Sequence, residues 1–267
     1  MLKMLFNLFK VLLVLLISIC GLLFLFQEKL IFFPQKLDKN HQFSFDQNFE
    51  EINIKTNDQK ILNALLFKSD SSKGLIFYLH GNAGSLSSWG DVAKVYTDLH
   101  YDVFMIDYRG FGKSEGSICS QKQLFADVQT AYSEMLKKYQ ENTIVVLGYS
   151  IGTGLASKIA STNQPQLLIL QAPYYSLTDM VQHTYPIIPT FLLKYKLETG
   201  KYVRDCKMPI VIFHGDQDEV IYYGSSLKLK DEFKKQDTLI TIEGQGHNGM
   251  TNNADYKIEL SKILKRE

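Results

Sequence analysis

The chain has 267 residues, 45% of them hydrophobic and 21% charged, which is typical of one large globular domain or of a domain with an appendage. Its 29 Lys and Arg residues nearly balance its 28 Asp and Glu residues, and no run rich in Lys and Arg is present. These numbers exclude a strongly basic nucleic-acid-binding protein, and three cysteines are too few for a disulfide framework.

The first 29 residues contain a long apolar run, and residues 11–26 carry no charge. Extended back to Leu5 the run covers about 20 residues, enough for one membrane-spanning helix. We therefore predict an uncleaved, single-pass membrane anchor over residues 1–29. The alternatives are a cleaved signal peptide, although no small-x-small site follows the run, and lipoprotein processing at Cys20. Lysines flank the span on both sides, so the positive-inside rule assigns no orientation.

Residues 30–48 form a predicted juxtamembrane linker that begins with the aromatic stretch "LIFFPQ". From residue 49 to residue 267 the pattern is that of a globular domain. It opens with "EEINIKT" and "KILNALLFK", which predict two strands around a turn at Asn57–Asp58.

Six short apolar runs follow, and each predicts a buried strand: 74–81, 101–110, 143–150, 167–173, 209–218 and 238–247. Near-continuous apolar strands are typical of a parallel sheet covered on both faces. Apolar residues recur at helical spacing between the runs, as in 124–139, and again near the end of the chain, from Tyr256 to Leu264. This alternation predicts an α/β fold with a mostly parallel, doubly wound sheet and helices on both faces.

Residues 174–208 interrupt the alternation with "YPIIPTFLLKY", which has two prolines and many large apolar side chains. Two interpretations stay open: a small cap-like insertion over the carboxyl edge of the sheet, or an ordinary long crossover. The segment is short, which disfavours a large lid.

A candidate nucleophile lies in "LGYSIGTGLA", where Ser150 ends a predicted strand and starts a predicted helix. A tight strand-to-helix turn projects a serine hydroxyl above the sheet, and the flanking Gly148 and Gly152 allow the close backbone approach that such a turn needs. A small residue at an ordinary turn is the plainer interpretation. Active sites of open α/β sheets lie beyond the carboxyl ends of the strands, where Ser150 is placed.

A serine hydroxyl needs a general base, and His247 follows the last predicted strand. A surface-loop histidine is the alternative for His247. A carboxylate would then orient the imidazole, and the stretch "FHGDQDEVI" at the end of the fifth apolar run offers Asp216, Asp218 and Glu219. We favour Asp218, because it lies deeper in the loop, and regard Asp216 as a turn-forming residue.

Acyl transfer also needs donors for the developing negative charge. We expect them to be the backbone N–H groups of Ile151, which follows the nucleophile, and of Asn82, in the loop "HGNAGS". His80 and His214 each precede a glycine at a strand end, and we interpret both as loop-shaping residues. A triad and two amides suffice for acyl transfer, so neither a metal nor an organic cofactor is expected.

Six segments, "LHGNAGS", "DYRGFGKSEG", "GYSIGTGLA", "APYYSL", "HGDQDEVI" and "GHN", together resemble the serine α/β-hydrolase superfamily. The closest likeness is to its membrane-anchored "alpha/beta-hydrolase domain-containing" branch, with a hydrolase domain similar to serine aminopeptidase S33, and it runs from about residue 30 onward. The resemblance implies an α/β-hydrolase fold with Ser150 as nucleophile, Asp218 as acid and His247 as base. Asp107, Arg109 and Gly110 match a segment that shapes the loop beside the site.

The leading hypothesis is a membrane-anchored serine hydrolase that cleaves carboxylic esters or thioesters of a small-molecule or lipid acyl substrate through an acyl-enzyme. Members of the branch that the chain resembles act on acyl groups of lipids or of lipid-modified proteins. A serine peptidase of the aminopeptidase or prolyl-peptidase type is the first alternative. A non-catalytic, membrane-tethered scaffold is the second. No nucleic-acid partner is expected, and the sequence indicates no oligomeric state.

Overall fold

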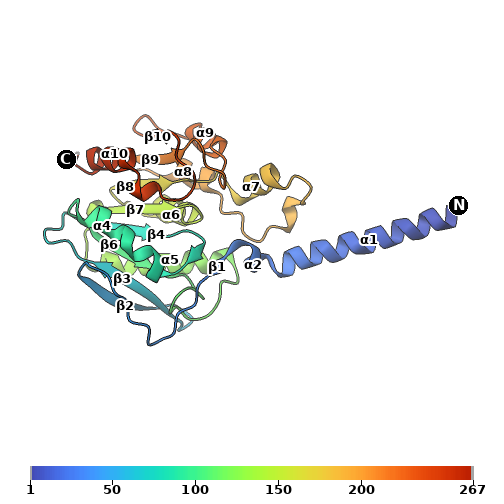
Figure 1. Cartoon of the computed structure of the whole chain (residues 1–267), viewed down its shortest axis with the longest axis horizontal. Coiled ribbons are helices and arrows are strands. Elements are labelled where there is room, and N and C mark those ends of the chain that lie inside the picture. Colours follow the sequence, from blue (N-terminus) through green and yellow to red (C-terminus); the bar gives the residue numbers. More distant parts are fainter. Residues whose placement is uncertain (1, 266–267) are drawn as a thin grey trace.

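The computed structural model describes residues 2–265, in which an apolar helix projects from an α/β body (Figure 1). This helix, α1 (Leu2–Leu25), is followed by α2 (Gln27–Ile31), which joins it to the body. The most apolar 18 residues of α1 have a mean hydropathy of 2.8, and none of them is buried. A membrane-spanning helix and a signal sequence share these properties.

The body contains an eight-stranded sheet in the order β10-β9-β8-β7-β4-β6-β3-β2. The sheet is parallel from β10 to β6, and β3 pairs in antiparallel fashion with both β6 and β2. The predicted α/β fold with a mostly parallel sheet is therefore confirmed. The strands are β2 (Phe49–Lys55), β3 (Ile61–Phe67), β4 (Leu75–Leu79), β6 (Asp102–Ile106), β7 (Ile144–Tyr149), β8 (Leu167–Gln171), β9 (Ile210–Gly215) and β10 (Thr238–Ile242).

Helices cover both faces of the sheet (Figure 1). The α-helices of the body are α3 (Leu86–Trp89), α4 (Ala93–Thr97), α5 (Gln121–Leu136), α6 (Gly152–Thr162), α7 (Leu177–Thr184), α8 (Thr199–Asp205), α9 (Gly224–Lys230) and α10 (Ala254–Leu264). Helix α5 begins three residues before the predicted segment 124–139, because the side chain of Ser120 caps it by accepting from the Gln123 N–H at 3.1 Å.

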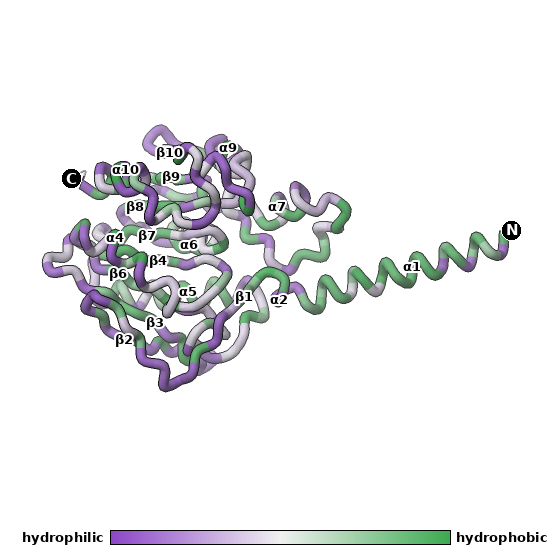
Figure 2. Tube along the Cα trace, viewed as in Figure 1, coloured by the Kyte–Doolittle hydropathy of each residue, from purple (hydrophilic) through white to green (hydrophobic). Residues whose placement is uncertain are grey.

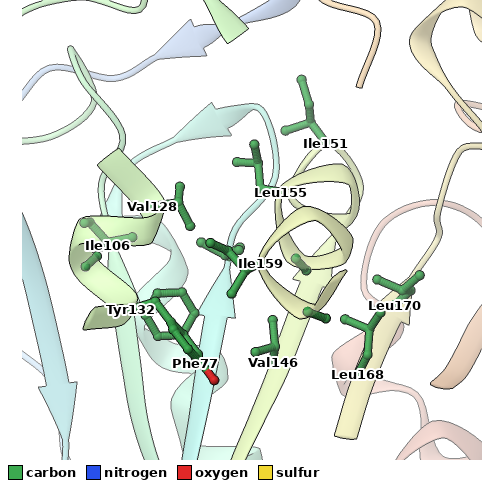
Figure 3. Close-up of a cluster of buried hydrophobic side chains, with 14 of the residues drawn as sticks. Phe77, Ile106, Val128, Tyr132, Val146, Ile151, Leu155, Ile159, Leu168 and Leu170 are labelled. Atoms are coloured by element: carbon green, nitrogen blue, oxygen red, sulfur yellow. The ribbon is translucent and has the colours of Figure 1, made fainter. Parts of the chain in front are cut away.

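The core consists of two layers, one on each face of the sheet, because successive side chains of a strand point to opposite faces. In β4, Phe77 packs in the layer with α5 and α6, whereas the neighbouring Ile76 and Tyr78 pack in the layer with α4 and α10. Figure 3 shows the first layer, where Leu155 and Ile159 of α6 point toward α5, which carries Val128 and Tyr132. Continuous apolar runs in the sequence follow from burial on both faces.

The loops that follow the strands begin earlier than the apolar runs suggested. Strand β9 ends at Gly215 and β10 ends at Ile242, so the segments 216–218 and 243–247 are loops. The polar residues in those loops therefore lie beyond the carboxyl edge of the sheet.

Residues 174–208 divide into two parts with different roles. The second part contains α8, whose Tyr202 and Val203 are buried against the body, as in an ordinary crossover helix. The first part, residues 177–196, contains α7 and a short 3-10 turn, η3 (Thr190–Leu192), and lies over the carboxyl edge on the side where α1 leaves the body (Figure 1). We call residues 177–196 the cap.

Candidate active site

Ser150 lies in the sharp turn between β7 and α6. Its φ of 52° is in the left-handed region, which costs a non-glycine residue about 1–3 kcal/mol and persists only where the surroundings impose it. The flanking glycines explain how the turn fits: a Cβ on Gly148 would lie 2.5 Å from the Gly152 carbonyl oxygen, and one on Gly152 would lie 2.1 Å from that of Leu79. Any side chain at either position would displace the turn that presents Ser150.

His247 and Asp218 converge on Ser150 from the loops after β10 and β9. The Ser150 Oγ lies 3.1 Å from His247 Nε2, and His247 Nδ1 lies 2.8 Å from Asp218 Oδ2. All three side chains are largely buried. With its proton on Nδ1, a neutral His247 donates to Asp218 and leaves Nε2 free to accept from the serine hydroxyl. The structure thus brings together the three residues that the sequence analysis selected.

Asp218 is held by four hydrogen-bonding neighbours. Its Oδ1 accepts the N–H groups of Val220 and Ile221, both at 2.8 Å, and its Oδ2 faces His247 and, at 3.2 Å, Nε2 of His214. Burial acts to raise the pKa of Asp218, but the hydrogen bonds from His214 and His247 outweigh it and hold the pKa below its ordinary value. The carboxylate is therefore charged where the imidazole needs a fixed acceptor.

Asp216, the alternative acid, has a different position. It is exposed, and its Oδ1 accepts the N–H of Gly244 at 2.7 Å, which links the loops after β9 and β10. No hydrogen bond joins it to His247 within residues 2–265. His214 is buried, and its Nδ1 lies 2.6 Å from Ser226 Oγ, so this histidine packs behind Asp218. His80 is likewise buried, with Nδ1 at 2.7 Å from the Gly81 carbonyl oxygen.

The two predicted oxyanion donors border the same cavity as Ser150. Asn82 and Ile151 both line it, and within the described chain neither backbone N–H donates to another group. Ile151 follows Ser150 at the start of α6, where the first N–H groups of a helix have no intrahelical acceptor. These N–H groups are available to an oxygen bound in the cavity.

The cavity beside Ser150 has a volume of about 400 Å³ and an apolar wall. None of its lining side chains is charged. Besides residues of the body such as Tyr174, Val220 and Ile221, two distant parts of the chain form the wall: the end of α1 with α2, and the cap. Its lining residues include Leu23, Leu30, Ile31, Leu177, Met180, Val181, Ile188, Leu192 and Leu193. A cavity of about 440 Å³ near Tyr101, Leu167 and Pro209 lies at the amino-terminal edge of the sheet, away from Ser150.

Residues 27–37, which follow α1, contact both the Asn82 loop and the cap. The side chain of Asn82 donates to the carbonyl oxygen of Ile31 at 3.0 Å, and the N–H of Phe33 donates to the carbonyl oxygen of Asn82 at 2.8 Å. A short parallel pair, β1 (Phe33–Pro34) with β5 (Ala83–Gly84), continues this contact. The predicted linker therefore begins with residues that support the Asn82 loop.

The same segment holds the cap. Gln27 is buried, and its side chain donates to the Leu192 carbonyl oxygen at 3.0 Å and accepts the Lys194 N–H at 2.8 Å. Glu28 pairs with Lys194 Nζ at 3.1 Å and accepts from the Tyr195 hydroxyl at 3.1 Å. Sequence analysis missed these contacts and the His214–Asp218 contact. A glutamine and a glutamate beside an apolar run carry no local signal of partners more than 160 residues away.

Comparisons with known proteins show relatives of this chain. The sequence profile described as "Serine aminopeptidase, S33" matches residues 70–202. Protein bem46 of Schizosaccharomyces pombe is 31% identical over 218 residues, which is 75% of this chain and 73% of that protein. Human alpha/beta hydrolase domain-containing protein 17B is 26% identical over 205 residues, or 74% of this chain and 69% of that protein.

The fold is also that of a solved esterase. A structure of a Pyrococcus furiosus esterase superposes with a TM-score of 0.70 at 18% identity, covering 88% of this chain and 97% of the esterase. At this identity the likeness concerns the fold. It extends over nearly the whole of the esterase, so the sheet and its covering helices are shared.

Proposed function

The chain belongs to the α/β-hydrolase superfamily, and we propose that it is a membrane-anchored serine hydrolase that cleaves carboxylic esters or thioesters of acyl substrates. The observation that carries the proposal is the line of contacts from Asp218 through His247 to Ser150, which ends at the floor of an apolar cavity. A triad is recognised by such geometry and roles.

In the first half-reaction His247 Nε2 takes the proton of the Ser150 hydroxyl as Oγ attacks the acyl carbonyl carbon. The negative charge that develops on the carbonyl oxygen is met by the N–H groups of Ile151 and Asn82. Asp218 stabilises the imidazolium. The tetrahedral intermediate then collapses, His247 gives its proton to the leaving alcohol or thiol, and the acyl group stays on Ser150.

In the second half-reaction water replaces the leaving group. His247 removes a proton from the water as its oxygen attacks the acyl-enzyme, and the same two N–H groups meet the oxyanion again. Collapse releases the carboxylic acid, and the proton returns from His247 to Ser150 Oγ. No charge accumulates on Asp218 beyond the one it already carries.

An acyl substrate fits the uncharged wall of the cavity. A chain of methylene groups gains about 0.8 kcal/mol for each one it buries, whereas a charged substrate group would find no partner among the lining side chains. Helix α1 supports a membrane location, since its apolar length suits a bilayer span. We propose that residues 1–29 are the anchor and residues 49–267 the hydrolase domain.

A fluorophosphonate probe tests the chemistry. We expect the purified chain to be labelled, the Ser150→Ala variant not to be labelled, and the Ser161→Ala variant, altered on the same helix, to be labelled like the parent. A folded parent chain that takes up no label would support a non-catalytic scaffold instead.

A serine peptidase is the second candidate, because the matching profile carries the name of an aminopeptidase. An aminopeptidase must bind a substrate ammonium, and the cavity offers no carboxylate among its lining residues. Turnover of p-nitrophenyl acyl esters should therefore exceed that of aminoacyl p-nitroanilides. Faster cleavage of the anilides would favour the peptidase.

A further inference from the structure

The tip of the cap, residues 185–191, exposes large apolar side chains that contact little of the body. Ile187 is 92% exposed and Phe191 is 82% exposed, and Tyr185 between them and α7 is 59% exposed. Residues 185–193, "YPIIPTFLL", contain no charge. Single exposed apolar residues are common, but three on one loop form a patch of the kind that marks a binding surface.

The cap tip lies beside the end of α1. Gln27 bonds the backbone of Leu192 and Lys194, and Lys194 Nζ lies 4.8 Å from the centroid of the Phe24 ring. Figure 2 shows the apolar α1 running up to the region where the cap meets α2. The two apolar surfaces are therefore neighbours, although they are about 160 residues apart in the sequence.

The length of α1 sets the depth of this junction in a bilayer. At 1.5 Å per residue its 24 residues span roughly 36 Å, which exceeds the roughly 30 Å hydrocarbon core. The uncharged run ends at Phe26 and is followed by the polar Gln27, Glu28 and Lys29, which places the last turn of α1 near the head-group region. The cap backbone at Leu192 and Lys194, which is hydrogen-bonded to Gln27, lies at about the same depth.

Basic residues border the apolar tip. Lys196, five residues after the tip, and Lys29 on α2 are exposed, whereas Lys194 pairs with Glu28. Lysines next to an apolar surface are typical of segments at the membrane interface, where the ammonium group reaches the phosphates and the side-chain stem stays in the apolar region.

The cavity connects this junction with the nucleophile. Leu23 at the end of α1 and Leu30 of α2 line it on the anchor side, Tyr185 and Ile188 line it at the cap tip, and Ser150 lies at its inner end. The mouth of the cavity therefore lies between two surfaces that suit a lipid environment.

We propose that the cap tip inserts into the head-group region of the bilayer that α1 spans, and that the cavity opens there, so that an acyl chain reaches Ser150 directly from the lipid phase. The occupant of the patch is thus lipid. The reasons are that the apolar patch is continuous with α1, carries no charge and is bordered by lysines. The route of the acyl chain rests on the proposed hydrolase function, whereas the insertion of the cap tip does not.

A depth measurement tests the insertion without any activity. The full chain is reconstituted in phosphatidylcholine nanodiscs with plain or brominated acyl chains, and tryptophan emission is recorded for Phe191→Trp, for Ile258→Trp and for the parent, which contains Trp89 alone. Ile258 is a matched control, because it is 53% exposed on α10, on the opposite side of the body from α1 (Figure 1).

We expect brominated lipid to reduce the emission added by Phe191→Trp at least about twofold and to leave that added by Ile258→Trp unchanged. Equal quenching of the two, or none at either site, would overturn the insertion of the cap tip.

An activity measurement tests the route of the substrate. We compare kcat/KM for p-nitrophenyl palmitate embedded in nanodiscs with that for p-nitrophenyl acetate in water, in the double variant Ile187→Asp with Phe191→Asp and in the control Ile258→Asp. The double variant should lose at least about tenfold on the embedded ester and stay within about twofold of the parent on acetate. The control should match the parent on both.

The outcomes separate the two proposals. Equal losses on both esters would show that the tip only supports the fold of the site, and no loss on either would show that the substrate bypasses it; both overturn the route from the lipid phase. If the parent hydrolyses neither ester, the hydrolase function and the route it supports both fail, while the quenching result still decides the insertion.

Discussion

The cavity has two sides that are built differently. On the sheet side, Ser150, Asp218 and His247 lie in loops after β7, β9 and β10, and the side chains of β7 and β9 are fully buried. On the other side, which we call the membrane side after the proposed anchor, α2 and the cap are short elements joined mainly by the side chains of Gln27 and Glu28. The sheet side is part of the core, whereas the membrane side is attached to it.

The two sides of the cavity meet two different requirements of the proposed reaction: fixed reacting atoms and an apolar wall. The reacting atoms need positions fixed within a few tenths of an ångström, which a packed sheet edge provides. An apolar wall only needs to exclude water and present an apolar surface, which short peripheral elements can do. Substitutions on the sheet side should therefore lower the turnover of every ester, and substitutions on the membrane side should change the preference between long and short chains.

The largest effect is expected from Ser150→Ala, which removes the nucleophile. Turnover of both p-nitrophenyl acetate and p-nitrophenyl palmitate should fall by at least about 10⁴-fold, with an unchanged circular dichroism spectrum. Ser161→Ala provides the control and should behave like the parent. Residual turnover above a tenth of the parent value would mean that the hydrolysis occurs elsewhere in the molecule.

The next effect concerns the acid. Asp218→Asn keeps the shape of the side chain but removes the charge that fixes the tautomer of His247, so kcat should fall by about 10³- to 10⁴-fold on both esters. Asp216→Asn is the matched control, two residues away and exposed, and should stay within about threefold. If Asp216→Asn lowered kcat more than Asp218→Asn, Asp216 would be the residue that orients His247.

A smaller and selective effect is expected on the membrane side. Leu30→Trp adds bulk to the cavity wall, so kcat/KM for p-nitrophenyl palmitate should fall about tenfold while that for the acetate stays within about twofold. Phe33→Trp is the control, because Phe33 is exposed nearby without lining the cavity. Equal losses on both esters would remove the distinction between the two sides.

The smallest effect is local. Gln27→Ala deletes the side chain that bonds the backbone at Leu192 and Lys194, which should lower the free energy of opening the cap by about 1 kcal/mol in total, at about 0.5 kcal/mol for each of the two lost bonds. The Lys194 amide should then exchange with deuterium roughly fivefold faster, with the exchange of β7 unchanged. Gln35→Ala, in the same segment but with an exposed side chain, should leave both rates as in the parent. Faster exchange throughout the sheet would show that the cap belongs to the core.

Much of the sheet side could be predicted from the sequence, because its signals are local. Strands buried on both faces appear as continuous apolar runs, as in β4 and β7, and a strained turn at Ser150 needs glycine at positions 148 and 152. The loops after β9 and β10 were predicted too, but the strand ends were placed too late. The strands end at Gly215 and Ile242, whereas the predicted runs extended into the polar residues that follow.

The membrane side was predicted only in part. The apolar run of α1 was evident from its composition, and "YPIIPTFLLKY" indicated an unusual segment. The division of residues 174–208 into a cap and the core helix α8 depended on which residues found space against the body. Helix α8 is buried because it packs beside α6, and the cap is exposed because no element covers it within the described chain.

The sequence alone predicted the order of strands and helices and the three candidate residues at their ends, since burial and tight turns leave their mark on adjacent residues. The folded chain established which distant groups meet: Gln27 with the cap, Ile31 with Asn82, and His214 with Asp218. Such contacts join segments that share no periodicity. Their partners are selected by the shape of the whole body, which no short stretch of residues encodes.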